Sequence, residues 1–351
     1  MLITKALFGT MPDGKEVYEY TLENNNNMKV KILSLGATLH SIILPNKDGE
    51  ETDVLLGFDD VEGYLAHNST YIGAAVGPVA NRIGNGCFEI DGTKFEVIKN
   101  EKDVTCLHSG GEFSFTVWNG IIADSDAVEF TYTSPDGLNG FPGEIQASVL
   151  YKLGQNNDLH IIYRAISNKK TPLNFTNHAY FNLAGCGNGD ILSHSMQLFS
   201  SAITPVDAFS IPTGEIMSVE NTAFDFRAAK EIGKDIDADE EQLRLTGGYD
   251  HNFIIDNADG TLQKCACVKN SDNNIEMNVY TTAPGVQFYA GNFLEGEIGK
   301  QNKAMCKRGG FCLETQFYPD SPNKPTFPNC IFEAGEEFKS ETVYILSVSE
   351  S

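Results

Sequence analysis

Two short stretches of the chain bring together side chains that can exchange protons near neutral pH. In Asn174–Leu183, His178 stands among three asparagines, a threonine and a tyrosine, while apolar neighbours predict a buried strand. In Gly310–Gln316, polar and apolar residues alternate, which predicts a strand with Glu314 on its polar face. A histidine alone in such surroundings is readily explained as a core residue that its neighbours satisfy. A histidine and a carboxylate, both in buried polar surroundings, indicate an acid–base pair.

A second set of polar residues lies in glycine-rich segments. Glycines flank Asn81 and Arg82 in Gly77–Gly86, so the backbone there can approach a ligand closely while two polar side chains are presented. Arginine offers five hydrogen-bond donors, which suit sugar hydroxyls or a carboxylate that must stay ionised. The alternative is a structural arginine that only stabilises the conformation of this loop. His108 opens another glycine-rich loop and is a further candidate.

Amide, aromatic and acidic residues add to this pattern in the second half of the chain. Gln287 stands beside Phe288 and Tyr289. Sugar sites combine such groups, because amides bond hydroxyls and ring faces cover C–H patches. Asp250 and His251 lie on opposite faces if their segment is extended, and alternation alone does not decide which of them faces a site.

The other histidines and the cysteines give weaker signals. Four of the seven histidines have no other potentially catalytic or binding residues beside them in the sequence, so structural or surface roles are predicted for them: His40, His67, His160 and His194. The eight cysteines are scattered, and the C-x-C pair Cys265 and Cys267 lacks a second pair nearby, so neither disulfides nor a structural metal is expected. Cys312 shares a strand face with Glu314. We therefore expect its thiol to border the site with a raised pKa, the alternative being a small filler in a packed wall.

The composition of the 351 residues excludes several classes of function. A formal net charge of -23 disfavours nucleic acid and anionic membranes as partners and also phosphorylated substrates, and it favours a neutral small molecule. No Walker or G-x-G-x-x-G pattern occurs, so no nucleotide cofactor is expected. The first residues lack the apolar run of a signal peptide, and no segment approaches the roughly 20 apolar residues of a spanning helix. These features predict a cytoplasmic protein.

Strands are the elements that must position these groups. Apolar residues alternate with other residues in four clear runs: 28–32, 128–132, 145–151 and 159–165. Asp-Gly turn signals punctuate the chain, and helical periodicity is limited to a short candidate at 227–232. Strands without intervening helices indicate an antiparallel sandwich or barrel, and no linker or repeat divides the chain. We predict one all-β domain over residues 1–351.

An acidic segment, Asp235–Asp239, has the spacing that begins a calcium-binding loop. An EF-hand loop requires glycine at its sixth position and glutamate at its twelfth, where this chain has Glu240 and Thr246. The segment is therefore predicted to be a solvated acidic turn.

The distinctive segments follow one another along nearly the whole chain: Gly77–Gly86, Leu107–His108, Ser134–Gly137, Phe141–Glu144, Asn177–Leu183, Thr204–Asp207, Ile211–Glu215, Gly248–Phe253 and Leu313–Gln316. In residues, order and spacing they resemble the motif series of the aldose 1-epimerase family. One such match would be weak, whereas this many in register make the resemblance specific.

The resemblance implies an all-β, single large antiparallel β-sandwich of the galactose mutarotase-like supersandwich type. It also implies cofactor-free interconversion of the α- and β-anomers of free hexoses such as galactose and glucose. By position, Glu314 matches the family's general base and His178 its general acid, which would act as an imidazolium. The family's sugar-binding positions match six residues of this chain: Asn81, Arg82, His108, Tyr180, Asp250 and Gln287. Of the two candidates at positions 250 and 251, the resemblance therefore favours the aspartate. The expected partner is a small-molecule aldose, and the expected state is a monomer or weak homodimer.

One segment departs from the family pattern. After His108 the family has two glycines and then Gly-Phe-Asp-Lys before a tryptophan, whereas this chain reads Ser109–Trp118 without the lysine. The difference concerns sugar preference more than the type of reaction.

Three other functions share part of this pattern. A hexose-phosphate 1-epimerase would need a cationic cluster, which the motifs lack. A non-catalytic sugar-binding protein would have lost Glu314 or His178, and both are present. A retaining glycosidase would need two carboxylates about 5–5.5 Å apart, and Asp250 is the only obvious partner for Glu314.

Overall fold

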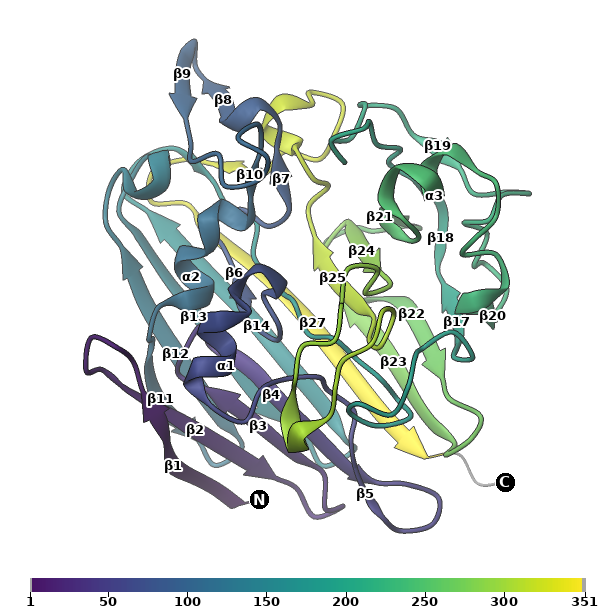
Figure 1. Ribbon diagram of the computed structural model, residues 1–351. Helices are drawn as coiled ribbons and strands as arrows, with labels where there is room; N and C mark the ends of the chain where they lie inside the picture. Colours follow the sequence, from purple (N-terminus) through teal and green to yellow (C-terminus); the bar gives the residue numbers. More distant parts are fainter. Residues whose placement is uncertain (1, 349–351) are drawn as a thin grey trace.

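A nine-stranded antiparallel sheet forms the back of the computed structural model, which describes residues 2–348 (Figure 1). The strands in their order across the sheet are β11 (Asn119–Asp124), β12 (Ala127–Ser134), β13 (Ile145–Leu153), β14 (Asp158–Ser167), β27 (Glu337–Val348), β23 (Ile275–Thr281), β22 (Gln263–Lys269), β17 (Ser195–Leu198) and β20 (Lys230–Glu231). The last strand of the chain lies between β14 and β23, so β27 joins the N-terminal and C-terminal parts of the molecule.

The alternation in the sequence sets which face of this sheet is buried. In β13, Ile145, Ala147, Val149 and Tyr151 are buried, whereas the residues between them are partly or fully exposed. The same pattern occurs in β14. Because successive side chains of a strand point to opposite faces, one face of the sheet is left to pack on other elements.

Two five-stranded sheets cover that face. The first contains β1 (Leu2–Thr10), β2 (Glu16–Glu23), β3 (Lys29–Leu33), β4 (Thr38–Pro45) and β5 (Glu51–Asp53). The second has the order β19 (Met217–Ser218), β18 (Ser200–Ile203), β21 (Asp250–Ile255), β24 (Gly285–Tyr289) and β25 (Cys312–Gln316). Tyr20 of β2 packs edge-on against Phe130 of β12, and Tyr344 of β27 donates to the Leu313 carbonyl of β25. The predicted all-β antiparallel sandwich is confirmed.

Short elements complete the chain and lie between the layers and at their rims. Four two-stranded pairs occur: β6 (Ala75–Val76) with β16 (Thr176–Asn177), β7 (Arg82–Ile83) with β10 (Cys106–Leu107), β8 (Cys87–Ile90) with β9 (Thr93–Glu96), and β15 (Thr171–Pro172) with β26 (Ile331–Phe332). The α-helices of the described residues are short: α1 (Val61–Ala66), α2 (Glu112–Phe115) and α3 (Glu241–Thr246). None of them is long and apolar enough to cross a membrane.

The short helical candidate at 227–232 does not form an α-helix. Lys230 and Glu231 instead form the edge strand β20, which pairs with Ser195 and Met196 of β17. The Lys230 ammonium bonds the Ala223 carbonyl and Asp235, which holds the segment in an extended form.

The acidic segment after β20 forms ion pairs. Asp235 pairs with Lys230, Asp237 with Arg308 and Asp239 with Arg244. Asp237 and Asp239 are mostly exposed, as expected for a solvated turn, and their charges are balanced by cations of the chain itself.

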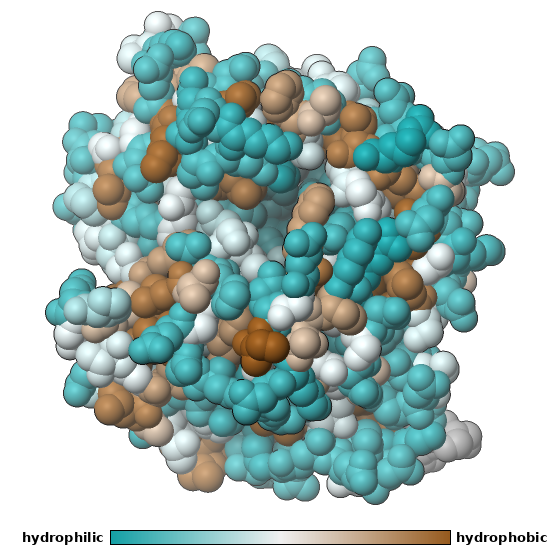
Figure 2. Space-filling model, in the orientation of Figure 1, coloured by the Kyte–Doolittle hydropathy of each residue, from teal (hydrophilic) through white to brown (hydrophobic). Residues whose placement is uncertain are grey.

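The hydrophobic core and the cysteines complete the fold. A cluster of buried apolar side chains includes Leu22 of the first sheet, Val149 of the large sheet and Phe288 of the second sheet, so all three sheets share it. All eight cysteines are free, as predicted. Figure 2 shows a mainly hydrophilic outer face on which hydrophobic residues occur in small, separate groups.

Candidate active site

A cavity of about 280 Å³ lies where the second five-stranded sheet meets the β7–β10 pair. Polar, charged and aromatic residues and two leucines from distant parts of the chain line it: Ser69, Thr70, Tyr71, Asn81, Arg82, Glu101, Leu107, His108, His178, Tyr180, Asp250, Tyr289, Phe293, Leu294, Glu297 and Glu314. Its size matches a small ligand, since drug-sized ligands occupy pockets of about 300–1,000 Å³.

The β7–β10 pair positions Asn81 and His108 against each other. The His108 N–H donates to the Asn81 carbonyl at 2.9 Å, and the Asn81 N–H donates to Nδ1 of the His108 ring at 3.2 Å. Both residues have left-handed backbones, with φ of 62° and 49°. This conformation is rare outside glycine and costs free energy, so the surrounding contacts must hold it in place.

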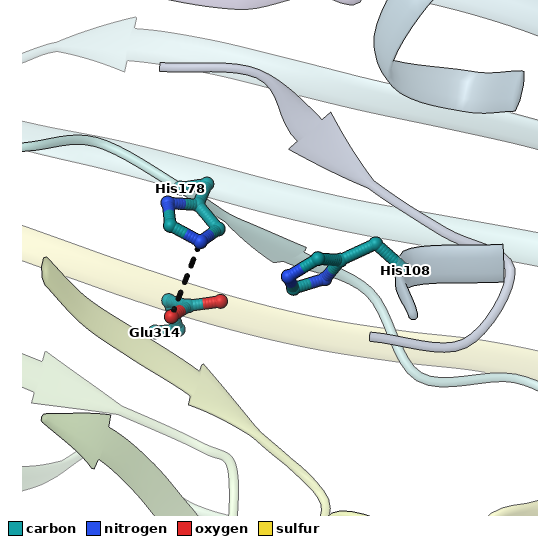
Figure 3. A group of neighbouring side chains, drawn as sticks. All are labelled: His108, His178 and Glu314. Atoms are coloured by element: carbon teal, nitrogen blue, oxygen red, sulfur yellow. Dashed lines mark ion pairs between the residues drawn. The ribbon is translucent and has the colours of Figure 1, made fainter. Parts of the chain in front are cut away.

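The contact with Asn81 defines the protonation of His108. A backbone N–H can only donate, so Nδ1 of His108 must accept and its neutral ring carries the hydrogen on Nε2. Burial lowers the pKa of His108 well below its usual value, and the nearby His178 and Arg82 lower it further. His108 therefore presents an Nε2–H donor, and Figure 3 shows its ring directed toward His178 and Glu314.

His178 follows the short strand β16, whose pairing with β6 fixes the backbone. The His178 N–H donates to the Ala74 carbonyl at 2.9 Å. The rings of Tyr180 and Tyr71 lie nearly parallel to the imidazole, with centroids at 5.1 and 6.2 Å. Nε2 lies 3.7 Å from Oε1 of Glu314, the pair marked in Figure 3.

The surroundings of His178 affect the charge of its ring. Burial lowers the pKa of His178 to about 4, and the charge of Arg82 acts in the same direction. Burial therefore favours the neutral ring at pH 7, because desolvation disfavours the charged form. That His178 acts as an imidazolium during the reaction stays a prediction.

Glu314 lies in the middle of β25, opposite Gln287 of β24. It is 2% exposed, and its Oε2 has no hydrogen-bond partner among the described residues. Burial raises the pKa of Glu314 well above its usual value; the charge of Asp250 raises it further, and Arg82 opposes the shift. A buried carboxyl oxygen without a partner is costly, so this atom is free to bond a hydroxyl group of a ligand.

Asp250 and Arg82 form the charged side of the cavity. Oδ1 of Asp250 accepts a 2.7 Å hydrogen bond from Gln287, and Oδ2 lies 4.0 Å from the Arg82 guanidinium. Arg82 also bonds Glu101 through Nε and Nη2, each at 2.8 Å. Arg82 is thus held between two carboxylates, and Asp250 between an amide and a cation.

Three of these groups could be considered as metal ligands, since one atom each of His108, His178 and Glu314 lies within 4.8 Å of the others. A ligating histidine offers the lone pair of one nitrogen and normally donates the other N–H to an acceptor. In His108 the second nitrogen accepts from the Asn81 N–H, so the nitrogen facing the cavity carries a hydrogen. This donor set fits proton exchange and hydrogen bonding better than metal binding.

The structure brings nearly all the predicted site residues together. Seven of the eight line the cavity: Asn81, Arg82, His108, His178, Tyr180, Asp250 and Glu314. Gln287 is 3% exposed and lies behind the wall, where its amide bonds Asp250. His251 points away and bonds Gln242, so Asp250 is the residue of this pair that faces the cavity.

Cys312 does not border the cavity as expected. It is fully buried and absent from the lining, with Sγ 3.5 Å from Nδ1 of His178. The prediction of a raised pKa is confirmed: burial raises the pKa of the thiol well above its usual value, and Glu314 and Asp250 raise it further. The histidines predicted to be structural also lie outside the lining: His40, His67, His160 and His194.

Sequence reasoning missed much of the wall of the cavity. Glu101 and Tyr71 have no distinctive neighbours in the chain, so only their contacts with Arg82 and His178 reveal them. Phe293 lies near Tyr289 and is 64% exposed. The segment that departs from the family pattern, Ser109–Trp118, supplies no lining residue.

Comparison with known proteins is consistent with this geometry. The family model of aldose 1-epimerase matches residues 18–345. A galactose mutarotase from Bos taurus is 41% identical over 99% of both chains, and an aldose 1-epimerase from Escherichia coli (strain K12) is 39% identical over 95% of this chain and 96% of its own. The crystal structure of a galactose 1-epimerase from Lactobacillus acidophilus NCFM superimposes with a TM-score of 0.87 at 29% identity, covering 99% of both chains. The chain belongs to the aldose 1-epimerase family.

Proposed function

We propose that this member of the family interconverts the α- and β-anomers of free hexoses, with Glu314 as general base and His178 as general acid. The observation that carries the proposal is the 3.7 Å approach of His178 Nε2 and Glu314 Oε1 within one polar cavity. The anomeric carbon bears both the hydroxyl that loses a proton and the ring oxygen that gains one. A base and an acid that serve two oxygens on one carbon must therefore be close neighbours.

The reaction requires one proton on this pair. Glu314 takes the proton of the C1 hydroxyl as the C1–O1 bond becomes a carbonyl and the bond from C1 to the ring oxygen breaks. The ring oxygen receives the proton from Nε2 of His178. Rotation about C1–C2 presents the other face of the aldehyde, and the reverse steps close the ring as the other anomer. Each positioned acid or base typically contributes about 10²–10⁴-fold.

Binding of the sugar would shift the pair into its working form. Burial raises the pKa of Glu314 and lowers that of His178, so it favours the neutral form of each group. A sugar hydroxyl that donates to the unpartnered Oε2 stabilises the carboxylate, and a ring oxygen that accepts from Nε2 stabilises the imidazolium. The sugar thus creates the ionised pair that reacts with it.

The remaining lining residues suit a neutral polyol. Arg82 and the Nε2–H of His108 donate hydrogen bonds, and Asp250 accepts them. The rings of Tyr180 and Tyr289 offer apolar surface to the C–H groups of the sugar. Gln287 supports binding through Asp250.

The charge balance opposes the alternative substrates. Among the lining residues of the described chain, Arg82 alone carries a fixed positive charge, against four carboxyl groups: Glu101, Asp250, Glu297 and Glu314. A hexose phosphate would find one cation, already bonded to Glu101. A retaining glycosidase would use Asp250 as its second carboxylate, yet one Asp250 oxygen accepts from Gln287 and the other faces Arg82.

Polarimetry on freshly dissolved α-galactose and α-glucose tests the proposal. Catalytic amounts of protein are expected to bring the rotation to equilibrium faster than buffer, and His178→Gln should abolish this effect. Binding of sugar without acceleration of mutarotation would support a binding protein instead.

The proposal extends to a cytoplasmic enzyme that works as one domain, as a monomer or weak homodimer. Free thiols at all eight cysteines support a reducing compartment. The core shared by the three sheets supports a single folding unit. Light scattering measures the molecular mass in solution, and one cooperative unfolding transition is expected; two separate transitions would contradict the single domain.

A further inference from the structure

Cys312 and His178 are in contact behind the cavity. Sγ of Cys312 lies 3.5 Å from Nδ1 of His178, on the side of the ring away from Glu314. The thiol is fully buried and stands two residues before Glu314 on the same face of β25. One strand therefore places a partner at each nitrogen of the imidazole.

Few other groups can bond Nδ1. Tyr180 and Tyr71 lie nearly parallel to the ring and contact its faces, so they leave its edge free. The backbone carbonyl of His178 itself also lies near the ring and is the competing acceptor, since a carbonyl that accepts the Gly73 N–H at 2.9 Å still has a second lone pair. The thiol is thus the side chain in hydrogen-bonding reach of Nδ1.

We propose that Cys312 is a positioning residue for His178, whose Sγ accepts the Nδ1 hydrogen and so leaves Nε2 as the nitrogen that exchanges a proton with the sugar. This inference rests on the proposed role of His178 as the acid. When His178 gives its Nε2 proton to the ring oxygen, the neutral ring that remains carries its hydrogen on Nδ1. An acceptor at that position stabilises the form that the reaction produces.

The chemistry of the thiol explains why a cysteine suits this place better than an acid. A carboxylate that orients a histidine also stabilises the imidazolium and makes the ring a stronger base. The buried thiol stays protonated, since its pKa is raised by burial and by Glu314. Cys312 therefore orients the ring without adding charge, and His178 remains a strong acid toward the ring oxygen.

The test is ¹⁵N NMR of histidine-labelled protein, in which two-bond ¹⁵N–¹H correlations report which ring nitrogen carries the hydrogen. The His178 signals are assigned by their loss in His178→Gln. The wild-type protein is expected to show neutral His178 with the hydrogen on Nδ1. Cys312→Ala should move the ring toward a mixture of both tautomers. It should also lower kcat about three- to tenfold with KM nearly unchanged, as expected for one modest hydrogen bond.

Two further variants separate orientation from packing. Cys312→Ser keeps a group that can accept from Nδ1 and is expected to preserve the tautomer and most of kcat. Cys265→Ala removes an equally buried thiol on β22, which bonds the Val279 carbonyl, and should leave both readouts unchanged. If Cys312→Ala fails to fold, the wild-type tautomer remains a test, because hydrogen on Nε2 of the neutral ring would overturn the inference.

Two results would overturn the inference: hydrogen on Nε2 in the neutral wild-type ring, or an unchanged tautomer and kcat in Cys312→Ala. In the second case the His178 backbone carbonyl suffices to hold the ring. Neither result would affect the proposed function, which fails only if wild-type protein does not accelerate mutarotation.

Discussion

The guanidinium of Arg82 and the carboxylate of Glu101 form a two-point ion pair, with Nε and Nη2 each 2.8 Å from a carboxylate oxygen. Thr105 donates a further 2.7 Å hydrogen bond to the same carboxylate. Burial alone would raise the pKa of Glu101, but Arg82 and Thr105 lower it below its usual value, so the carboxylate stays ionised. The pair orients Arg82 and leaves Nη1 toward Asp250 in the cavity.

Glu101→Gln should weaken sugar binding more than turnover. The amide removes one charge and one acceptor, so Arg82 is held less firmly while the Glu314–His178 pair is left in place. Loss of a charge-assisted hydrogen bond of about 1.5–3 kcal/mol predicts a rise of KM by about tenfold or more. Progress curves by polarimetry over a range of galactose concentrations measure it. Glu96→Gln is the control, since Glu96 pairs only with exposed Lys94; an equal effect in both variants would contradict this role.

Glu314→Gln is expected to lower kcat by about 10²-fold or more while sugar binding persists. The amide keeps the shape of the side chain but cannot take the C1 hydroxyl proton. Polarimetry gives the rate, and isothermal titration with galactose gives the affinity. Turnover close to that of the wild type would show that another group is the base.

Activity should follow a bell-shaped dependence on pH, because the pair must hold one proton. Acid adds a second proton to His178, whose pKa burial lowers to about 4, so activity should fall as the pH drops through this region. Alkali removes the remaining proton, and because burial raises the pKa of Glu314, this limb lies well above the usual range of a carboxyl group. Both limbs belong to the coupled pair rather than to one residue. A rate of catalysis that stays constant from acid to alkali would exclude the scheme.

Alkylation should spare Cys312 in the folded protein. Its thiol is fully buried with a raised pKa, whereas Cys306 is exposed. Thiolate is the reactive form, so iodoacetamide is expected to label Cys306 first, with no loss of activity and no effect of added galactose. Mass spectrometry of the labelled peptides identifies the thiols. Labelling of Cys312 that galactose prevents would instead place this thiol at the cavity.

Local patterns in the sequence determined the strands and the main chemical groups. The alternation in 145–151 and 159–165 predicted β13 and β14, because in a half-buried sheet each residue's face follows from its position in the chain. The same rule placed Glu314 on the polar face of β25. The short helical candidate at 227–232 is not a helix, because pairing with β17 outweighed a short local preference.

Only the tertiary structure decided how these groups act on one another. Cys312 and His178 are 134 positions apart, and Arg82 and Glu101 are 19 apart, so no local pattern predicts either contact. The neutral state of His178 has the same origin, since its lowered pKa comes from desolvation by residues gathered from several strands. Residue type and spacing show which groups can exchange a proton. Burial and distance depend on the packing of the whole chain, and they decide where the proton rests and which nitrogen releases it.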